Sequence, residues 1–554
     1  MMKRDFAALG KSTFDLCVIG GGVQGAATAR EAALRGFKVV LVEARDFSSG
    51  TSSRSSKLIH GGLRYLEQLD FKLVAEARRE RRLLQQLAPH LARPMPFLLP
   101  IYRGDGYSPL KIRMGLTLYD LLGNLGRQDR HRMLSAKSAV ELMPALSSDG
   151  LRAAALYHDS STDDARLTLE YVLDAAEHGA VVANYAEVRG LATSTRAGAR
   201  EVVAAEVEDC LTGRRIELSA RYWVNAAGPW VDRVRALLPG FDGSKTVRLD
   251  KGTHLLIPPV TGRHALLAPV LSDGRVFLIV PWHNCALLGT TETDFEGDPA
   301  TVRPDRADTE YLLAAANRVL RRQLTAQDVA GCWTGLRALA VEPRESDKPA
   351  SASTREYRFH EDPWARNIVS ICGGKLTTAR ALGEKLTDFM TARFSRMGLA
   401  APLAPAEGPS SRSLPLPGGY TGSFEMYVHV ASWDAVREYD VPLEVGERIV
   451  RTYGSRWRKV LERVRSERSL AEPLPGSPKL LPAEVEFAIE HEMAVTVEDF
   501  LLRRSGLNWT AQLVPEAAPA VAEIFARRLG WSAERREAAL EDYSRSACVT
   551  ARST

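Results

Sequence analysis

Residues 16–43 read LCVIGGGVQGAATAREAALRGFKVVLVE, and the rest of the chain can be interpreted outward from them. Leu16–Ile19 is a short apolar run typical of a buried parallel strand, and Val39–Val42 is a second one. Between them, three glycines precede an alanine-rich segment, 26–35, that predicts a helix. The succession of strand, glycine turn, helix, strand and the acid Glu43 is the pattern of a dinucleotide-binding unit.

Each part of this turn has a physical task. Gly20 permits the tight turn, Gly22 lets a pyrophosphate approach the backbone, and Gly25 lets the helix pack closely on the strand. The free N–H groups at the helix N-terminus, around Gln24, and the positive end of the helix dipole favour phosphate. Glu43 is placed to accept hydrogen bonds from a ribose diol. We therefore expect these five residues to contact a dinucleotide.

The length, composition and net charge of the chain limit the class of protein. A length of 554 residues predicts about two to four domains, and 45% hydrophobic with 25% charged residues is typical of a soluble globular protein. No apolar run is long enough for a membrane-spanning helix, and residues 1–11 lack a secretory signal, so we expect a cytoplasmic protein. Six cysteines without a CxxC pair argue against a disulfide framework or a metal site. The net charge of +5 is too small to indicate a nucleic-acid partner, and no nucleic-acid-binding motif is present. This charge does fit an anionic small substrate or an anionic lipid surface.

Three further segments are candidates for cofactor contacts. The hydroxyl-rich run 51–56, TSSRSS, can donate to phosphates, and the glycines that follow let the backbone approach a flat group. Asn225–Trp230 and Gly373–Thr378 are glycine turns that follow predicted buried strands, as in the opening unit. The candidate contacts in these segments are Thr51, Ser52, Ser53, Ser56, Lys57, His60, Gly61, Gly62, Ala227, Gly228, Gly374, Lys375, Leu376 and Thr377.

The string SSKLIHGGLRYLE at 55–67, after IGGGVQGA at 19–26, resembles the FAD-dependent, quinone-linked, aerobic-type glycerol-3-phosphate dehydrogenase family. Further similar segments follow in the family's order: DDARL (163–167), NAAGPWVD (225–232), KGTHLLIP (251–258), GTTETDFEGDP (289–299), GLRAL (335–339), STREY (353–357) and GGKLTTAR (373–380). The resemblance implies FAD as cofactor, sn-glycerol 3-phosphate as substrate, dihydroxyacetone phosphate as product and a membrane quinone as electron acceptor.

The resemblance also implies an α/β fold in three parts. These are a Rossmann-like FAD-binding domain of the glutathione-reductase and D-amino-acid-oxidase type, a substrate domain with a mixed antiparallel β-sheet, and a C-terminal α-helical domain. The corresponding ranges are 1–79, 156–245 and 340–400; 80–155 and 246–339; and 420–554 after a Pro/Gly/Ser-rich linker, 401–419. For the helical domain we expect packing, formation of a homodimer or docking of the acceptor.

A phosphate dianion requires several cationic donors. By resemblance, the substrate site contains Arg64, Tyr65, Arg337, Arg355 and Lys375. His254 is the candidate general base and His60 the second choice, since an imidazole can take the hydroxyl proton. Arg337 could instead stabilise the developing alkoxide and is the third catalytic candidate.

The sequence departs from the family pattern at two places, and one predicted helix has two possible roles. Arg54 interrupts the serine-rich run and can add a pyrophosphate contact, whereas Ala338–Leu339 replaces a proline-containing turn after Arg337. The predicted helix Pro109–Leu122 is apolar with cations at its ends, which suits either a core helix or a helix in an anionic membrane interface. The latter would make the protein peripheral to the inner face of the cell membrane.

Three alternatives to the quinone-linked dehydrogenase remain open at this point. The same scaffold could support an oxidase that passes electrons to O₂ and releases H₂O₂, or an amine oxidase of the glycine and sarcosine type. A flavin-bearing binding protein without turnover is the third, and the set of cations argues against it. Reduction of the flavin by glycerol 3-phosphate without oxygen, followed by peroxide detection, distinguishes them.

Overall fold

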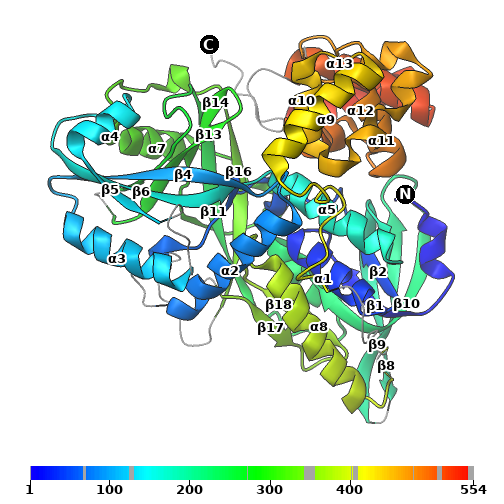
Figure 1. Cartoon of the computed structure of the whole chain (residues 1–554). Coiled ribbons are helices and arrows are strands. Elements are labelled where there is room, and N and C mark those ends of the chain that lie inside the picture. Colours follow the sequence, from blue (N-terminus) through cyan, green and yellow to red (C-terminus); the bar gives the residue numbers. More distant parts are fainter. Residues whose placement is uncertain are drawn as a thin grey trace.

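The computed structural model describes residues 2–66, 70–123, 130–196, 198–270, 273–341, 356–400, 402, 410–477, 479–507 and 514–546. Two β-sheets lie side by side, and a compact group of C-terminal helices lies above the first of them (Figure 1). This agrees with the predicted α/β fold with a mixed second sheet and a helical C-terminal domain.

The first sheet has the strand order β17-β18-β10-β1-β2-β7, with β9 and β8 continuing from β10. Strand β1 is parallel to both β2 and β10, and β18 is parallel to β10, so the centre of the sheet is a parallel core. Its strands are β1 (Phe14–Ile19), β2 (Val39–Val42), β7 (Val181–Ala183), β8 (Ala186–Arg196), β9 (Ala199–Asp209), β10 (Arg215–Asn225), β17 (Arg358–Glu361) and β18 (Ile368–Cys372).

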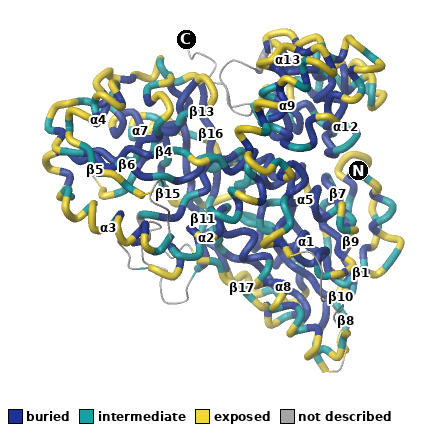
Figure 2. Tube along the Cα trace, in the orientation of Figure 1, coloured by how far each residue is buried: buried dark blue, intermediate teal, exposed yellow. Residues whose placement is uncertain are grey.

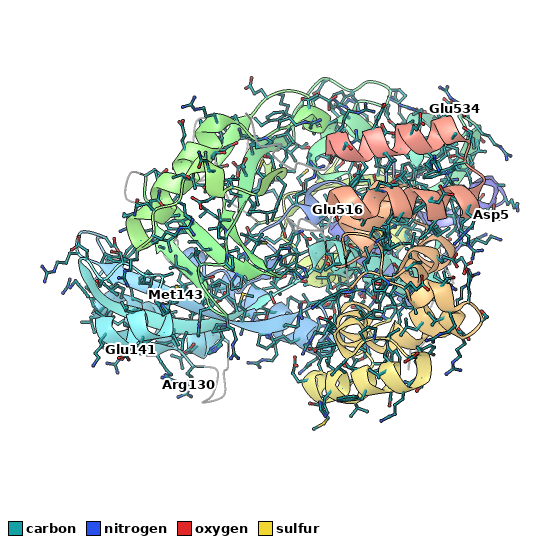
Figure 3. All side chains as sticks on the ribbon, turned by 90° about the horizontal axis from the view of Figure 1, so that it is seen from above. Asp5, Arg130, Glu141, Met143, Glu516 and Glu534 are labelled. Atoms are coloured by element: carbon teal, nitrogen blue, oxygen red, sulfur yellow. The ribbon has the colours of Figure 1, made fainter. Side chains whose placement is uncertain are left out.

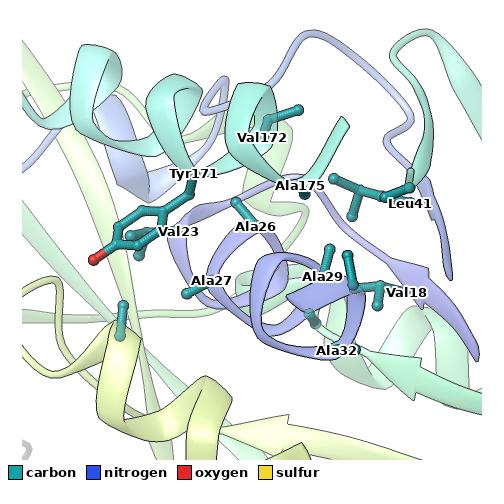
Figure 4. Close-up of a cluster of buried hydrophobic side chains, with 14 of the residues drawn as sticks. Val18, Val23, Ala26, Ala27, Ala29, Ala32, Leu41, Tyr171, Val172 and Ala175 are labelled. Atoms are coloured by element: carbon teal, nitrogen blue, oxygen red, sulfur yellow. The ribbon is translucent and has the colours of Figure 1, made fainter. Parts of the chain in front are cut away.

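Helix α1 (Val23–Leu34) packs on this sheet and against helix α5 (Asp164–Glu177), and its alanines Ala26, Ala29 and Ala32 allow a close approach (Figure 4). Helix α8 (Ala379–Arg396) approaches α1 so closely that a Cβ on Gly383 would lie 2.7 Å from the carbonyl oxygen of Ala27. Helix α1 begins three residues before the predicted start, because its first N–H, on Val23, already has an acceptor in the Ser52 hydroxyl, 2.9 Å away.

The second sheet has the order β15-β11-β14-β13-β12-β4-β6-β3, with β16 paired to β11 and β5 to β6. Its strands are β3 (Leu58–Ile59), β4 (Arg93–Tyr102), β5 (Arg132–Ser135), β6 (Leu151–Ser161), β11 (Val247–Ile257), β12 (Ala265–Pro269), β13 (Val276–Trp282), β14 (Cys285–Gly289), β15 (Thr293–Phe295) and β16 (Gly331–Ala340). Strand β3 and the end of β6 belong to this sheet, although we predicted their residues for the FAD-binding part.

Two features of this sheet differ from expectation. Because prolines interrupt 89–100, no strand is predicted there, but β4 covers most of this range. Pro94, Pro96 and Pro100 are separated by even numbers of residues, so the positions that lack an N–H group all face the same side of the strand. Ala338–Leu339 forms no turn, because β16 continues to Ala340.

Helices α2 (Phe71–Leu87), α3 (Pro109–Leu122), α4 (Ala136–Leu142), α6 (Val231–Arg235) and α7 (Arg306–Val319) complete the two larger parts. The arginines of α2 were expected on a solvated face, but Arg78 and Arg81 are buried. Arg81 donates to Asp159 at 2.8 Å, and Arg78 lies over the Tyr119 ring at 3.8 Å. Partners that come from β6 and α3 thus draw these cations inside.

The C-terminal domain contains α9 (Phe424–Tyr439), α10 (Leu443–Tyr453), α11 (Trp457–Leu461), α12 (Pro482–His491), a π-helix (Asp499–Arg504), α13 (Val514–Leu529) and α14 (Ala533–Ser546). Of these, α9 was not predicted. Buried ion pairs attach the domain to the first sheet, because both Arg503 and Arg504 donate to Asp46, and Arg166 donates to Glu492 at 2.7 Å. Seen from above, α13 and α14 lie at the opposite side of the molecule from Arg130, Glu141 and Met143 (Figure 3).

Candidate active site

A cavity of about 2140 Å³ joins the two sheets. The N-terminal turn of α1 lines one wall through Gly22 and Gln24, and strands β11 and β16 line another through His254 and Arg337. The turn after β18 adds Lys375. Segments more than 350 residues apart in sequence therefore meet around one space, as expected for a site between a dinucleotide-binding and a substrate-binding domain.

The opening glycines form a close-packed cradle. Gly20 has a φ of +113°, and a Cβ there would lie 2.6 Å from the Ala226 carbonyl oxygen. A Cβ on Gly25 would lie 1.9 Å from the Gly20 carbonyl oxygen, so Gly25 permits the contact of helix and turn without itself lining the cavity. Gly22, by contrast, lines the cavity, and its backbone is open to an approaching phosphate.

Glu43 is held at the edge of this cradle. Its carboxylate accepts hydrogen bonds from the backbone N–H groups of Gly21, at 2.6 Å, and of Arg45, at 2.9 Å. Burial raises the pKa of Glu43, while these two N–H groups favour the charged form. The side chain lines the cavity, and its contact with a ribose stays a prediction.

Two turns that are distant in sequence are joined opposite the cradle. The Gln24 amide donates to the Gly373 carbonyl at 2.6 Å, and Gly374, with a φ of +99°, leaves room for that amide. The Thr377 hydroxyl accepts from the His60 N–H at 3.2 Å and lies 3.3 Å from the His60 carbonyl. The segment around His60 is thereby fixed relative to the turn after β18.

Most predicted site residues line this cavity, and they are Gly20, Gly22, Gln24, Glu43, Thr51, Ser52, Ser56, His60, Gly62, Ala227, Gly228, His254, Arg337, Gly374, Lys375, Leu376 and Thr377. Gly25, Ser53, Lys57 and Gly61 do not. Lys57 was expected to contact the cofactor, but its ammonium is buried and donates to Asp164 and to the Ser53 carbonyl, both at 2.6 Å. Arg355 and the side chains of Arg64 and Tyr65 lie outside the described residues.

His254 faces the cavity from β11. Its Nε2 lies 2.8 Å from the Ser56 hydroxyl, and its ring stacks on Trp333 with centroids 5.2 Å apart. Its buried Nδ1 has no hydrogen-bond partner among the described residues. Burial, together with the nearby charges of Arg337 and Lys57, lowers the pKa of His254 to about 3, so the imidazole is neutral at pH 7.

Sequence reasoning missed a wall of the cavity that comes from the C-terminal domain. Arg503 of the π-helix and Arg535, Tyr543 and Arg545 of α14 line the cavity there, together with the acids Glu498 and Asp542. Arg54 lies beside this wall, and burial with repulsion from other arginines lowers its pKa. No local signal could have assigned these helical residues to the site, since a helical pattern does not say which face meets another domain.

A family model for FAD dependent oxidoreductases matches residues 15–389, and a model for the C-terminal domain of alpha-glycerophosphate oxidase matches residues 410–536. Glycerol-3-phosphate dehydrogenase 2 of Mycobacterium tuberculosis is 37% identical over 534 residues, which cover 95% of this chain and 86% of that protein. The chain belongs to the FAD-dependent glycerol-3-phosphate dehydrogenase family. The family's enzyme from Synechocystis is 34% identical, with 98% of this chain and 97% of that protein covered.

Solved structures agree with this membership. The glycerol-3-phosphate dehydrogenase of Bacillus halodurans, solved with FAD, has a TM-score of 0.77 at 30% identity, with 98% of this chain and 95% of that chain covered. The L-alpha-glycerophosphate oxidase of Mycoplasma pneumoniae shares the fold, with a TM-score of 0.53 at 18% identity, 69% of this chain and 95% of that chain covered. FAD is the cofactor of the family, and the cradle at Gly20 and Gly22 and the acid Glu43 fit its two phosphates and its ribose.

Gly25 provides a test of the cradle. We expect Gly25→Ala to lower the FAD content of the purified protein severalfold, because overpacking at this contact costs about 1–3 kcal/mol or more and moves the phosphate-binding turn. Absorbance at the flavin band relative to protein measures the content. Gly190→Ala in β8 is the matched control, since a Cβ there would meet only the Glu206 side chain, at 3.8 Å or more, and Gly190 does not line the cavity. Equal flavin content in the two variants would contradict the prediction.

Proposed function

We propose that this enzyme oxidises sn-glycerol 3-phosphate to dihydroxyacetone phosphate and passes the electrons to a membrane quinone. The observation that carries the proposal is one cavity that combines a phosphate-binding helix N-terminus with a neutral histidine, His254, and two cations, Arg337 and Lys375. The near full-length similarity to enzymes named glycerol-3-phosphate dehydrogenase supports the same substrate.

The proposed reaction removes a hydride from C2 and a proton from the C2 hydroxyl, so that a carbonyl remains. When bound, FAD supplies the two-electron acceptor for the hydride. His254 takes the hydroxyl proton, and Arg337 stabilises the developing negative charge at the oxygen. Arg337 and Lys375, together with Arg64, Tyr65 and Arg355, hold the phosphate. The dianion also brings negative charge toward His254, which favours the protonated imidazole.

Anaerobic reduction tests the proposal directly. Glycerol 3-phosphate added to the oxidised holoenzyme without oxygen should bleach the flavin band, whereas glycine or sarcosine should leave it unchanged. An unbleached flavin in the presence of glycerol 3-phosphate would overturn the proposal, and bleaching by the amino acids would favour the amine oxidase. Little peroxide in air and rapid turnover with a soluble quinone would support the dehydrogenase over the oxidase.

A quinone acceptor requires access to the bilayer, and α3 offers the surface for it (Figure 2). None of the helices in the described ranges has the length and apolarity needed to cross a membrane. Leu110, Met114, Leu118 and Leu121 nevertheless form one stripe along α3, and their exposed fractions are 66%, 66%, 36% and 70%. Exposed cations, among them Lys111 and Arg113, flank the stripe. This combination suits a peripheral helix on the anionic inner face of the cell membrane.

Replacing Met114 by glutamate should therefore weaken membrane binding. We expect Met114→Glu to lower the fraction that cosediments with vesicles of equal parts phosphatidylcholine and phosphatidylglycerol by roughly tenfold, because a carboxylate then faces the acyl region and the anionic lipids. Met426→Glu on α9 is the control, with a native exposure of 64%. The prediction fails if both variants cosediment like the unmodified protein.

A further inference from the structure

Strands β11 and β16 carry three cross-strand pairs on the face that they turn toward the cavity. Because directly opposed residues of antiparallel strands share a face, and alternate residues return to it, the register gives these pairs without ambiguity. From the outer end inward they are Asp250 with Arg337, Gly252 with Gly335, and His254 with Trp333. The glycine pair Gly252–Gly335 therefore lies between the ion pair of Asp250 with Arg337 and the stacked rings of His254 and Trp333.

The Arg337 guanidinium is folded back over the first of these glycines. A Cβ on Gly252 would lie 2.7 Å from Nη2 and 2.9 Å from Nη1 of Arg337, so only glycine admits this conformation. Nη1 donates to the Asp250 carboxylate at 2.7 Å and to the Thr291 carbonyl at 3.3 Å. Nη2 donates to the Thr290 hydroxyl at 3.1 Å. Three acceptors from two chain segments therefore fix the guanidinium plane.

The Asp250 carboxylate pairs with the Arg337 guanidinium on the side away from the cavity. Its side chain is 1% exposed and is not part of the cavity wall, whereas Arg337 is 24% exposed and lines the cavity. A carboxylate in this position is stabilised by the guanidinium it faces. It also holds Arg337 on the same side of the strand as His254, four residues along β11 from Asp250.

We propose that Asp250 is a positioning residue that holds Arg337 in the conformation that receives the anionic substrate. This inference rests on the proposed function. Without the carboxylate, the long arginine side chain can leave Gly252 and extend into the cavity, so the contact between guanidinium and substrate becomes one of many conformers. Asp250 acts only through Arg337 and contacts neither substrate nor cofactor.

The test compares Asp250→Ala and Asp250→Asn in the FAD-loaded enzyme. Asp250→Ala should lower kcat/KM for glycerol 3-phosphate by roughly 10–10²-fold, the scale of a misplaced positioning group. Asp250→Asn keeps an acceptor oxygen for Nη1, so we expect a smaller loss. Asp388→Asn is the matched control, because Asp388 on α8 pairs with Arg35, which is also 24% exposed, and neither residue lines the cavity.

A double-mutant cycle separates positioning from a structural role. In the Arg337→Ala background, Asp250→Ala should cause no further loss of kcat/KM, because the group it positions is absent. An equal loss with and without Arg337 would overturn the proposal.

Anion binding provides a readout independent of turnover. Inorganic phosphate should perturb the absorbance of the oxidised flavin at about tenfold higher concentration in Asp250→Ala than in the unmodified enzyme or in Asp388→Asn. Equal phosphate affinity in all three proteins would overturn the proposal. If glycerol 3-phosphate fails to reduce the unmodified enzyme while the phosphate affinities still differ in this way, the proposed substrate is wrong and the positioning role of Asp250 is supported.

Discussion

Replacing Lys57 by methionine should destabilise the folded chain by about 3–5 kcal/mol, the usual cost of removing one partner of a buried ion pair. Lys57 and Asp164 are both 0% exposed, and the ammonium lies 2.6 Å from the carboxylate. The ammonium also lies over the rings of Trp282 and Trp333. Methionine fills a similar volume, so the loss arises mainly from the charge left on Asp164. Denaturant-induced unfolding measures it.

Two further variants locate the cause of this effect. The double variant Lys57→Met with Asp164→Asn should recover much of the stability, because no uncompensated charge remains. Lys137→Met should change stability by less than about 0.5 kcal/mol, since Lys137 and its partner Glu141 are exposed. A Lys57→Met variant as stable as Lys137→Met would show that the buried pair contributes little.

The Lys57→Met substitution should also weaken the binding of FAD. Lys57 lies between Ser56 and His60, which line the cavity, and its carbonyl accepts the Thr162 N–H at 2.8 Å. The segment that contributes these contacts is therefore fixed partly by an ion pair behind the cavity wall. We expect Lys57→Met to lose FAD at lower denaturant concentrations than the unmodified enzyme.

His254→Gln should lower the rate of anaerobic flavin reduction by glycerol 3-phosphate by about 10²-fold or more, the scale expected for a general base. Glutamine can retain a hydrogen bond to the Ser56 hydroxyl, so the fold around the site should persist, but it cannot take up the hydroxyl proton. Rapid-mixing absorbance measures the rate. His264→Gln is the control, because His264 lies outside the cavity wall. A rate within threefold of the unmodified enzyme would remove His254 from this role.

The same histidine predicts a pH dependence of stability. The pKa of His254 is about 3 in the folded chain and near 6.5 when exposed, so the unfolded chain binds more protons between these values. This contribution is fully present above pH 6.5 and is lost as the pH falls toward 3. His254→Gln should therefore flatten the loss of stability on acidification, as measured by thermal unfolding between pH 7 and pH 4.

The opening unit was predictable because its physics is local. The tight turn at Gly20, the start of α1 and the acid at the end of β2 all follow from residues within about 30 positions of one another. Helix α3 has its predicted bounds, Pro109–Leu122, for the same reason, since Ser108 caps its first turn and Gly123 follows its last residue. The family motifs placed His254 and Arg337 in one site.

Other assignments depended on contacts that no local pattern contains. Lys57 belongs to a segment rich in cofactor candidates, yet Asp164 turns it away from the cavity. Arg78 and Arg81 occur in a basic run that suggests solvent, but Tyr119 and Asp159 receive them in the interior.

The amino-acid sequence by itself determined the dinucleotide-binding unit, the cofactor class and a set of residues that line the cavity, because short-range turn chemistry and ordered motifs encode them. Only the tertiary structure decided that α14 and Arg503 complete the cavity wall and that Asp250 stands behind Arg337. Asp250 and Arg337 are 87 residues apart in the chain, and Arg503 is 457 residues from Asp46, its partner beside the cavity. Long-range packing brings such positions together, and the conformational choice at each depends on all of its neighbours at once.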